Sequence, residues 1–228
     1  MQATNSLLNI FIYVLFFGFS WMCKIRGIHR LINDDEVFTS KPRGLISTHI
    51  IGTIWLGLVP VILLKQSILK VLTEIKVPVS FIIVLYFFVL ILIITIAFEQ
   101  SKKDYEKSQG SYESFARLSS KFFNSYFIVR ALFLFSYELW FRGFVLFGCI
   151  HRFGIPFAIF LNVTLYVFLH IFNGKKEALA CVPFGLLVCF FSIIFNSALP
   201  AIILHIGFSL VYEINIYRLN LINYKTVK

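Results

Sequence analysis

Three stretches of this chain place ionisable or hydrogen-bonding side chains at intervals of four within otherwise apolar sequence. Residues four apart lie on one face of an α-helix, so each stretch predicts a helix with one polar stripe. Three such stripes are more than helix packing alone explains. Their members are Glu138 and Arg142 in RALFLFSYELWFRG, then Asn162, Tyr166 and His170, then His205, Ser209 and Glu213.

Together these stripes offer the groups needed for water-driven amide hydrolysis. A carboxylate beside an imidazole can remove a proton from water, and a second imidazole and a hydroxyl can donate hydrogen bonds to a developing oxyanion. We therefore interpret Glu138, His170, His205, Arg142 and Ser209 as the candidate catalytic residues.

Two other interpretations of the same residues stay open. Glu138 and Arg142 alone could form a structural ion pair that locks neighbouring helices. Two histidines and one glutamate can also bind zinc, but His-Glu-x-x-His does not occur. We expect neither a metal nor a cofactor. His49 and Asn196 also lie near the apolar stretches, and we expect both to be structural.

The elements that carry the stripes are predicted to be membrane spans. Hydrophobic residues make up 59% of the 228 residues and charged residues only 14%, which is far from the balance of a soluble domain. Roughly 20 apolar residues are needed to cross the bilayer. We predict an all-α polytopic membrane helix bundle of about seven transmembrane helices, forming a single membrane domain over residues 1–228. The predicted spans are about 6–23, 44–64, 78–98, 124–149, 155–172, 177–193 and 198–217.

The basic residues predict an orientation. Alternate connections are rich in Lys and Arg, whereas the others hold only Lys65, Lys70, Lys76 and Arg152. Because Lys and Arg are retained inside, we expect the N-terminus outside, the C-terminus in the cytoplasm, and the bacterial cytoplasmic membrane as the location. The polar stretch at about 99–121 is then a cytoplasmic connection. The formal charge of +10 forms no stripe, so we expect no nucleic-acid partner.

Three motifs resemble a known family. They are YELWFRGF from Tyr137 to Phe144, YVFLH ending at His170, and HIGFS beginning at His205. They are similar to the CAAX-processing and bacteriocin-processing (CPBP, Abi) intramembrane endopeptidases. The pattern of that family is Glu-Glu-x-x-x-Arg, Phe-x-x-x-His and His-x-x-x-Asn on successive helices. The similarity covers a core of about residues 125–217.

The resemblance implies a glutamic-type endopeptidase without an obligatory metal, acting on a protein or peptide substrate among membrane lipids. In the family, the first Glu and the motif-two His activate water, the later His and Asn polarise the scissile carbonyl, and the Arg balances charge. Glu138 matches the second Glu, Arg142 the Arg, His170 the motif-two His and His205 the motif-three His. The residues indicate neither a particular substrate nor an oligomeric state.

Three departures from the family pattern affect this prediction. Tyr137 replaces the first Glu, Tyr166 the Phe and Ser209 the Asn. A phenol, whose ordinary pKa is about 10, is a poor base at neutral pH. Adjacent helix residues differ by about 100° in direction, so Glu138 can reach the water only if its helix is rotated or locally distorted. The alternative function is a catalytically degenerate membrane scaffold or partner-binding protein. A small transporter is a third possibility, against which the lack of repeated halves argues.

Overall fold

The computed structural model describes residues 2–32, 38–64, 68–76, 79–107, 115 and 118–227. Within these residues the chain is helical and contains no β-sheet, only an isolated bridge between Ile32 and Phe38. Seven helices are long and apolar enough to cross a membrane. The prediction of an all-α polytopic membrane protein with seven spans is confirmed.

The first three spans precede the region that carries the polar stripes. The first is α1 (Gln2–Ile25). The second joins α2 (Pro42–Thr53), a π-helical segment η1 (Ile54–Leu58) and α3 (Val59–Leu64). A short helix, α4 (Ile68–Thr73), comes before the third span, α5 (Ser80–Lys107).

The last four spans carry all three stripes. The fourth joins α7 (Ser120–Glu138), a second π-helical segment η2 (Leu139–Leu146) and α8 (Phe147–Phe153). The fifth is α9 (Ile155–His170), which ends in a 3₁₀ turn η3 (Ile171–Asn173). The sixth is α10 (Lys175–Phe195) and the seventh is α11 (Leu199–Val227).

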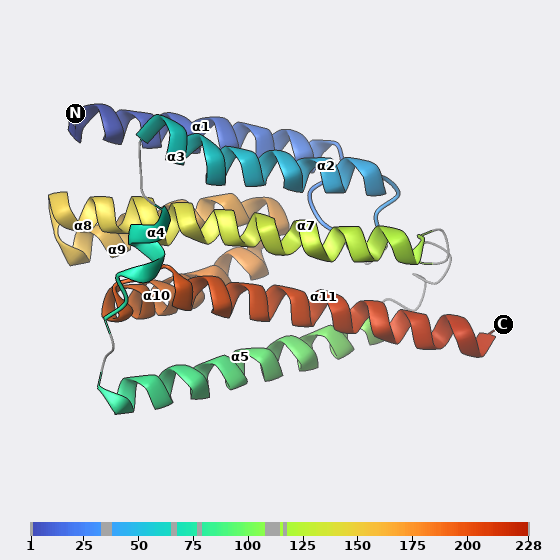
Figure 1. Cartoon of the computed structure of the whole chain (residues 1–228). Coiled ribbons are helices and arrows are strands. Elements are labelled where there is room, and N and C mark those ends of the chain that lie inside the picture. The colour runs from blue at the N-terminus through green and yellow to red at the C-terminus, as the bar shows by residue number, and fades with distance from the viewer. Residues whose placement is uncertain are drawn as a thin grey trace.

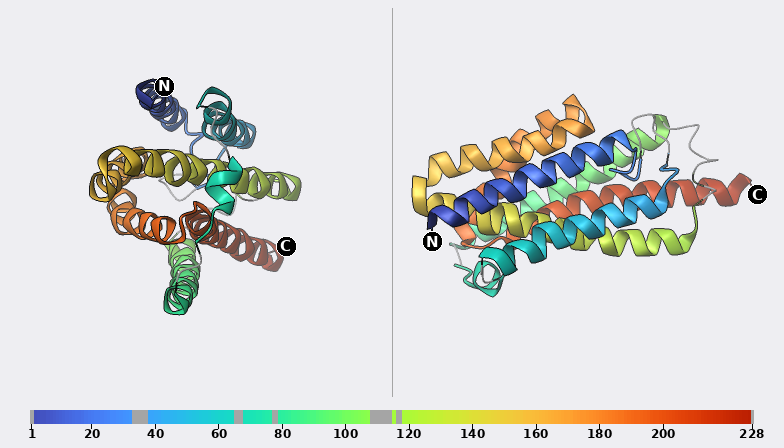
Figure 2. Two further views of the ribbon diagram at one scale, coloured as in Figure 1. Left: turned by 60° about the vertical axis from the view of Figure 1, so that its left-hand side comes forward. Right: turned by 90° about the horizontal axis from the view of Figure 1, so that it is seen from above.

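The spans pack as a bundle in which the fourth span is central (Figure 1). Helices α1 and α2–α3 lie side by side on one side of α7, while α10 and α11 lie on the other, and α5 is outermost against α11 (Figure 2). Helix α9 reaches α1, because the Tyr13 hydroxyl donates to the Leu165 carbonyl oxygen at 3.0 Å. The two termini lie at opposite ends of the bundle, as an odd number of spans requires. Large apolar side chains on α5, such as Phe81, Val84 and Phe88, are exposed, which suits a helix surrounded by lipid.

Local sequence signals set several helix ends. Ser119 caps α7, since its hydroxyl accepts a hydrogen bond from the Phe122 amide at 3.2 Å. Pro156 lies in the first turn of α9. Ser197 accepts from the Leu199 amide at 3.1 Å at the start of α11. Asn196 ends α10 in a left-handed conformation.

The polar stretch predicted as a connection at about 99–121 is partly helical. Helix α5 continues to Lys107. Pairs one turn apart stabilise this extension; for example, Lys102 Nζ lies 2.9 Å from Glu99 Oε1. The Tyr212 hydroxyl of α11 also donates to Asp104 at 2.9 Å. The period of these polar residues is therefore helical, and α5 extends beyond its apolar run.

Candidate active site

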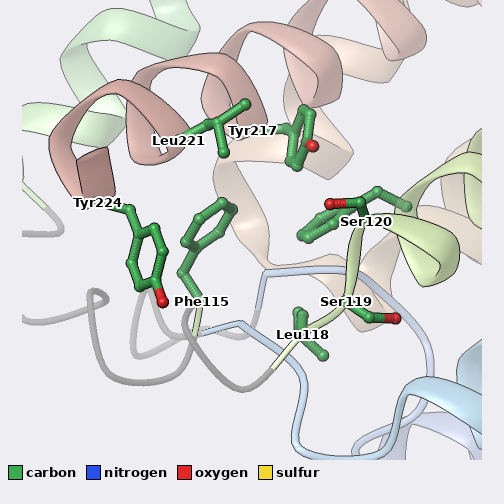
Figure 3. Close-up of a pocket in the computed structure, with 8 residues that line it drawn as sticks. Phe115, Leu118, Ser119, Ser120, Tyr217, Leu221 and Tyr224 are labelled. Atoms are coloured by element: carbon green, nitrogen blue, oxygen red, sulfur yellow. The ribbon is translucent and has the colours of Figure 1, made fainter. Parts of the chain in front are cut away.

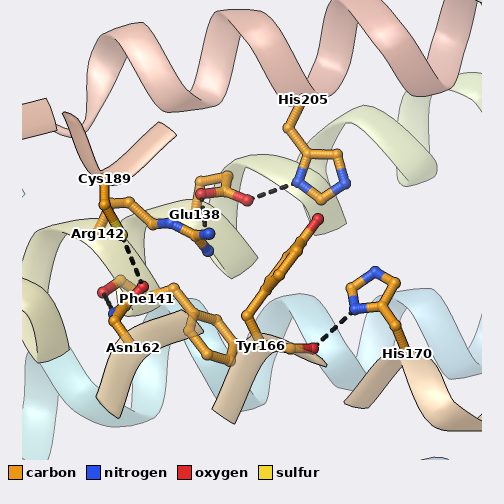
Figure 4. A network of polar contacts seen from close by, with 8 residues as sticks. All are labelled: Glu138, Phe141, Arg142, Asn162, Tyr166, His170, Cys189 and His205. Carbon is orange, nitrogen blue, oxygen red and sulfur yellow. Dashed lines mark hydrogen bonds and ion pairs between the residues drawn. The ribbon is translucent and has the colours of Figure 1, made fainter. Parts of the chain in front are cut away.

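Glu138, the last residue of α7, links two of the predicted motifs. Its Oε1 lies 2.5 Å from Nδ1 of His205 on α11, and its Oε2 lies 3.3 Å from Nη1 of Arg142 (Figure 4). The side chains of Glu138 and Arg142 are fully buried. Since a carboxylate only accepts hydrogen bonds when ionised, the imidazole of His205 donates from Nδ1 and leaves Nε2 as its free nitrogen.

A π-helical segment begins immediately after Glu138. In η2 the main-chain hydrogen bonds run from residue i to residue i+5, and all eight residues of the segment are buried. This register changes the direction of residues beyond Glu138 relative to an uninterrupted α-helix. The span is therefore locally distorted from Leu139 to Leu146, directly after Glu138 and including Arg142.

Asn162 stabilises this distortion from the neighbouring helix. Its Nδ2 donates to the main-chain oxygen of Phe141, inside η2, at 2.7 Å, and the Cys189 thiol donates to its Oδ1 at 3.4 Å. Asn162 belongs to the polar stripe predicted on α9. Its side chain thus supports the backbone of the site.

His170 ends α9 on the same side of the site. Its Nδ1 lies 2.9 Å from the Tyr166 carbonyl oxygen, which can only accept, so Nδ1 carries the proton. The ring of Tyr166 stands between the imidazoles, with its centroid 4.4 Å from that of His170 and 6.2 Å from that of His205. Among the described residues, neither His170 Nε2 nor His205 Nε2 has a hydrogen-bond partner.

Tyr137 occupies the position of the family's first Glu and is buried beside the same groups. Its ring is nearly perpendicular to both imidazoles, at centroid distances of 6.3 Å from His170 and 5.9 Å from His205. Its hydroxyl has no hydrogen-bond partner within the described part of the chain. Tyr137 therefore lies at the site without an ion pair or a hydrogen bond to Glu138.

The three polar side chains predicted on one face of α11 do not all reach the same site. Ser209 is buried, but in the described ranges it makes no hydrogen bond to Glu138, Arg142, His170 or His205. By helical geometry it lies one turn from His205. Of the five predicted site residues, the structure thus joins Glu138, Arg142 and His205 directly, adds His170 through Tyr166, and leaves Ser209 apart.

Glu213 belongs to a second polar layer that the sequence analysis did not predict. Its Oε1 lies 3.2 Å from Nε of Arg130 on α7. Arg130 Nη1 lies 3.3 Å from Nε2 of His49, whose Nδ1 lies 2.8 Å from the Leu45 carbonyl oxygen. We call His49, Arg130 and Glu213 the Arg130 layer, and Glu138, Arg142, His170 and His205 the Glu138 layer.

A regular spacing relates the two layers. Arg130 precedes Glu138 by eight residues on α7, and Glu213 follows His205 by eight residues on α11. At 1.5 Å per residue the layers lie about 12 Å apart along an antiparallel helix pair. This equal spacing is the signal by which the second layer could have been found. His49 lies in the Arg130 layer with a partner on each ring nitrogen. Asn196 donates to the Glu74 carbonyl at 3.0 Å, outside both layers.

In the described ranges no group of three or more His, Cys, Asp or Glu side chains could hold a metal ion. A pocket of about 180 Å³ lies where the start of α7 meets the end of α11 (Figure 3), and none of its lining residues belongs to either layer. Those residues are Phe115, Leu118, Ser119, Ser120, Phe123, Tyr217, Leu221 and Tyr224.

The fold and the Glu138 layer together define a polytopic membrane protein with a buried carboxylate, guanidinium and two imidazoles drawn from three spans. Residues 120–211 match the model of a protein family described as type II CAAX prenyl endopeptidase Rce1-like. This match supports the predicted resemblance to the CAAX-type intramembrane proteases over residues 120–211. No curated protein and no solved structure matched the chain.

The residues matched by the family model include the whole Glu138 layer but only one residue of the Arg130 layer. All of the Glu138 layer lies within residues 120–211, and so does Ser209. Of the Arg130 layer, only Arg130 lies within it, because His49 and Glu213 fall outside. The family likeness thus follows the Glu138 layer.

Proposed function

We propose that this protein is an intramembrane endopeptidase of the glutamic type, which hydrolyses a peptide bond of a protein or peptide substrate at the Glu138 layer. The observation that carries the proposal is the 2.5 Å contact between Glu138 and His205. A carboxylate that holds Nδ1 of an imidazole fixes its tautomer and directs Nε2 at the reacting groups.

The proposed reaction begins with a water molecule between the imidazoles. His205 Nε2 takes a proton from this water, while Glu138 stabilises the imidazolium that forms. The water oxygen bonds to the carbonyl carbon, and the π electrons of the carbonyl move to its oxygen. When the carbon–nitrogen bond breaks, His205 returns the proton to the leaving amine. His170 Nε2 holds the attacking water.

Arg142 has a supporting role in this proposal. It lies on the other oxygen of Glu138 at 3.3 Å and is fully buried. A single buried carboxylate is costly in a low-dielectric interior unless a counter-charge accompanies it. Arg142 therefore keeps Glu138 ionised between turnovers, so that the carboxylate is ready to stabilise the imidazolium.

The orientation inferred from the basic residues completes the proposal. With the N-terminus outside and the C-terminus in the cytoplasm of a bacterial cell, the end of α9 that bears His170 faces the cytoplasmic side. A reporter whose activity depends on the compartment, fused to each terminus in turn, tests this orientation. Signals of the same kind from both termini would contradict it.

The direct test is cleavage of an internally quenched peptide library by the full chain in lipid nanodiscs. We expect cleavage by the wild type and loss of at least about 10²-fold in kcat/KM for His170→Ala. His49→Ala is the matched control, because His49 is a buried histidine whose two nitrogens both have partners. Equal activity of His170→Ala and the wild type would contradict the catalytic assignment.

A second candidate function follows from Tyr137, which provides no carboxylate at the position of the family's base. It is a membrane scaffold that binds a partner and has lost hydrolysis. Wild type that does not cleave, together with a Tyr137→Glu variant that does, would establish this alternative. A stable partner that co-purifies equally with the wild type and with variants at Glu138 and His205 would support it.

A further inference from the structure

Tyr166 contacts three of the four residues of the Glu138 layer, namely Arg142, His170 and His205. Only 2% of it is exposed, and its ring packs against both imidazoles at the distances given above. On its other face, Arg142 Cζ lies 4.5 Å from the ring centroid. Its carbonyl oxygen holds His170 Nδ1 at 2.9 Å. Tyr166 thus contacts the side chains that the proposed reaction uses without taking part in their ion pair.

The hydroxyl of Tyr166 is directed at the reacting groups. In Figure 4 the phenol extends from α9 into the space between the imidazoles, with its oxygen towards His205 and Glu138. The cation–π contact with Arg142 and the tilted ring contact with His170 hold the ring in this position. The Cys181 thiol is a polar neighbour of this side chain, and a thiol is a weak hydrogen-bond partner. The hydroxyl can therefore donate to a stronger acceptor that enters the site.

Amide hydrolysis at this site needs such a donor. As water adds, the carbonyl oxygen gains negative charge, and a donor fixed in advance is often the largest single contribution to catalysis. Arg142 lies 3.3 Å from Glu138 and 4.5 Å from the centre of the Tyr166 ring, and its guanidinium nitrogens make no hydrogen bond in the described part of the chain; Ser209 makes none to the layer either. A phenol donates to an oxyanion without losing its proton at neutral pH, because its ordinary pKa is about 10.

We propose that Tyr166 is a further catalytic residue, whose hydroxyl donates a hydrogen bond to the scissile carbonyl oxygen as that oxygen becomes negatively charged. This inference rests on the proposed endopeptidase function. Tyr166 keeps its proton throughout, while the proton from water moves to His205 and then to the leaving amine. The hydroxyl binds the transition state more strongly than the substrate, so its removal lowers kcat rather than raising KM.

The test is Tyr166→Phe, which keeps the ring, its packing and its contact with Arg142 and removes one oxygen atom. We expect kcat for the best-cleaved library peptide to fall by about 10²-fold, with KM changed by less than about twofold. A phosphinic analogue of that peptide mimics the tetrahedral intermediate, so its affinity should fall by the same factor as kcat. A purely structural role for the hydroxyl would not produce this match.

Tyr86→Phe is the matched control, since Tyr86 is buried and its hydroxyl donates to the Pro200 carbonyl oxygen at 3.2 Å, outside both layers. It should keep kcat within about threefold of the wild type. If Tyr166→Phe does the same, or if Tyr86→Phe loses as much activity, the assignment to Tyr166 is wrong. Glu138→Gln separates this failure from that of the proposed function: a wild type that does not cleave, or a Glu138→Gln variant as active as the wild type, overturns both.

Discussion

The two polar layers between α7 and α11 use the same kinds of side chain and arrange them differently. In the Arg130 layer the carboxylate meets a guanidinium, and the imidazole of His49 has a partner on each nitrogen. In the Glu138 layer the carboxylate meets both a guanidinium and an imidazole, and two imidazoles keep one nitrogen each without a partner among the described residues.

This difference helps to distinguish a buried ion pair that only stabilises the fold from one that takes part in a reaction. Buried polar groups are normally satisfied, and the imidazole of the Arg130 layer follows that rule. The ion pairs of both layers contain buried atoms without a hydrogen-bond partner, so the difference lies in the imidazoles. In the Glu138 layer Nε2 of His170 and Nε2 of His205 have no partner among the described residues, at the place where a reacting molecule would bind. Residue type alone does not separate the two cases, because each layer contains Glu, Arg and His.

The largest contrast should appear when the carboxylate of each layer is replaced by an amide. Glu138→Gln removes the charge that stabilises the His205 imidazolium, so we expect kcat/KM to fall by about 10²–10⁴-fold. Glu213→Gln should leave kcat/KM within about fivefold, because its layer does no chemistry. Peptide cleavage in nanodiscs measures both. Comparable losses in the two variants would remove the distinction between the layers.

Removing each guanidinium compares the layers by stability. Arg142→Leu leaves a fully buried carboxylate without its counter-charge, so we expect a loss of about 3–5 kcal/mol in the free energy of unfolding. Arg130 and Glu213 have side chains that are 21% and 12% exposed, so water can compensate part of the loss. We expect Arg130→Leu to cost about half as much. Unfolding in mixed micelles with rising SDS measures both, and a larger cost at Arg130 would reverse the ranking.

A variant of Asn162 tests whether the π-helical segment η2 is needed for the geometry of the Glu138 layer. Asn162→Leu leaves the Phe141 carbonyl without its donor, which should cost about 1–3 kcal/mol and lower kcat about tenfold through displacement of Glu138. Asn215→Leu is the control, since Asn215 donates to Ser101 at 2.7 Å between α11 and α5. It should lower stability without a comparable loss of kcat. An equal loss of kcat in both variants would attribute the effect to general destabilisation.

The smallest effect should come from a chelator. No set of three metal-ligating side chains is grouped in the described ranges, in either layer or elsewhere. We expect incubation with EDTA to change peptide cleavage by less than about twofold, since a catalytic metal would supply a much larger share of the rate. Loss of cleavage that zinc restores would replace the glutamic mechanism with a metal-dependent one.

Much of the fold could be predicted from the sequence because bilayer thickness fixes how many apolar residues a span needs. All seven spans follow from that rule. The extension of α5 to Lys107 was missed because hydropathy marks the edge of the lipid, while the helix continues on paired charges such as Lys102 and Glu99.

The site was only partly predictable, because spacing identifies a helix face but not what that face meets. The pairing of Glu138 with Arg142 follows from the interval of four. The contact between Glu138 and His205 depends on how α7 and α11 pack, and the division of the α11 stripe between two layers depends on their register. The π-helical segment carries no simple residue signature, and its support by Asn162 comes from another helix.

The π-helical segment also has a consequence for insertions and deletions. A π-helical turn accommodates one residue more than an α-helical turn, so a single-residue deletion within 139–146 need not break the span. It would instead restore α-helical geometry while the parts of the span before and after η2 keep their directions. The same deletion within α7 would rotate one part of the span by about 100° against the other. A single deletion should therefore be better tolerated between Leu139 and Leu146 than within α7.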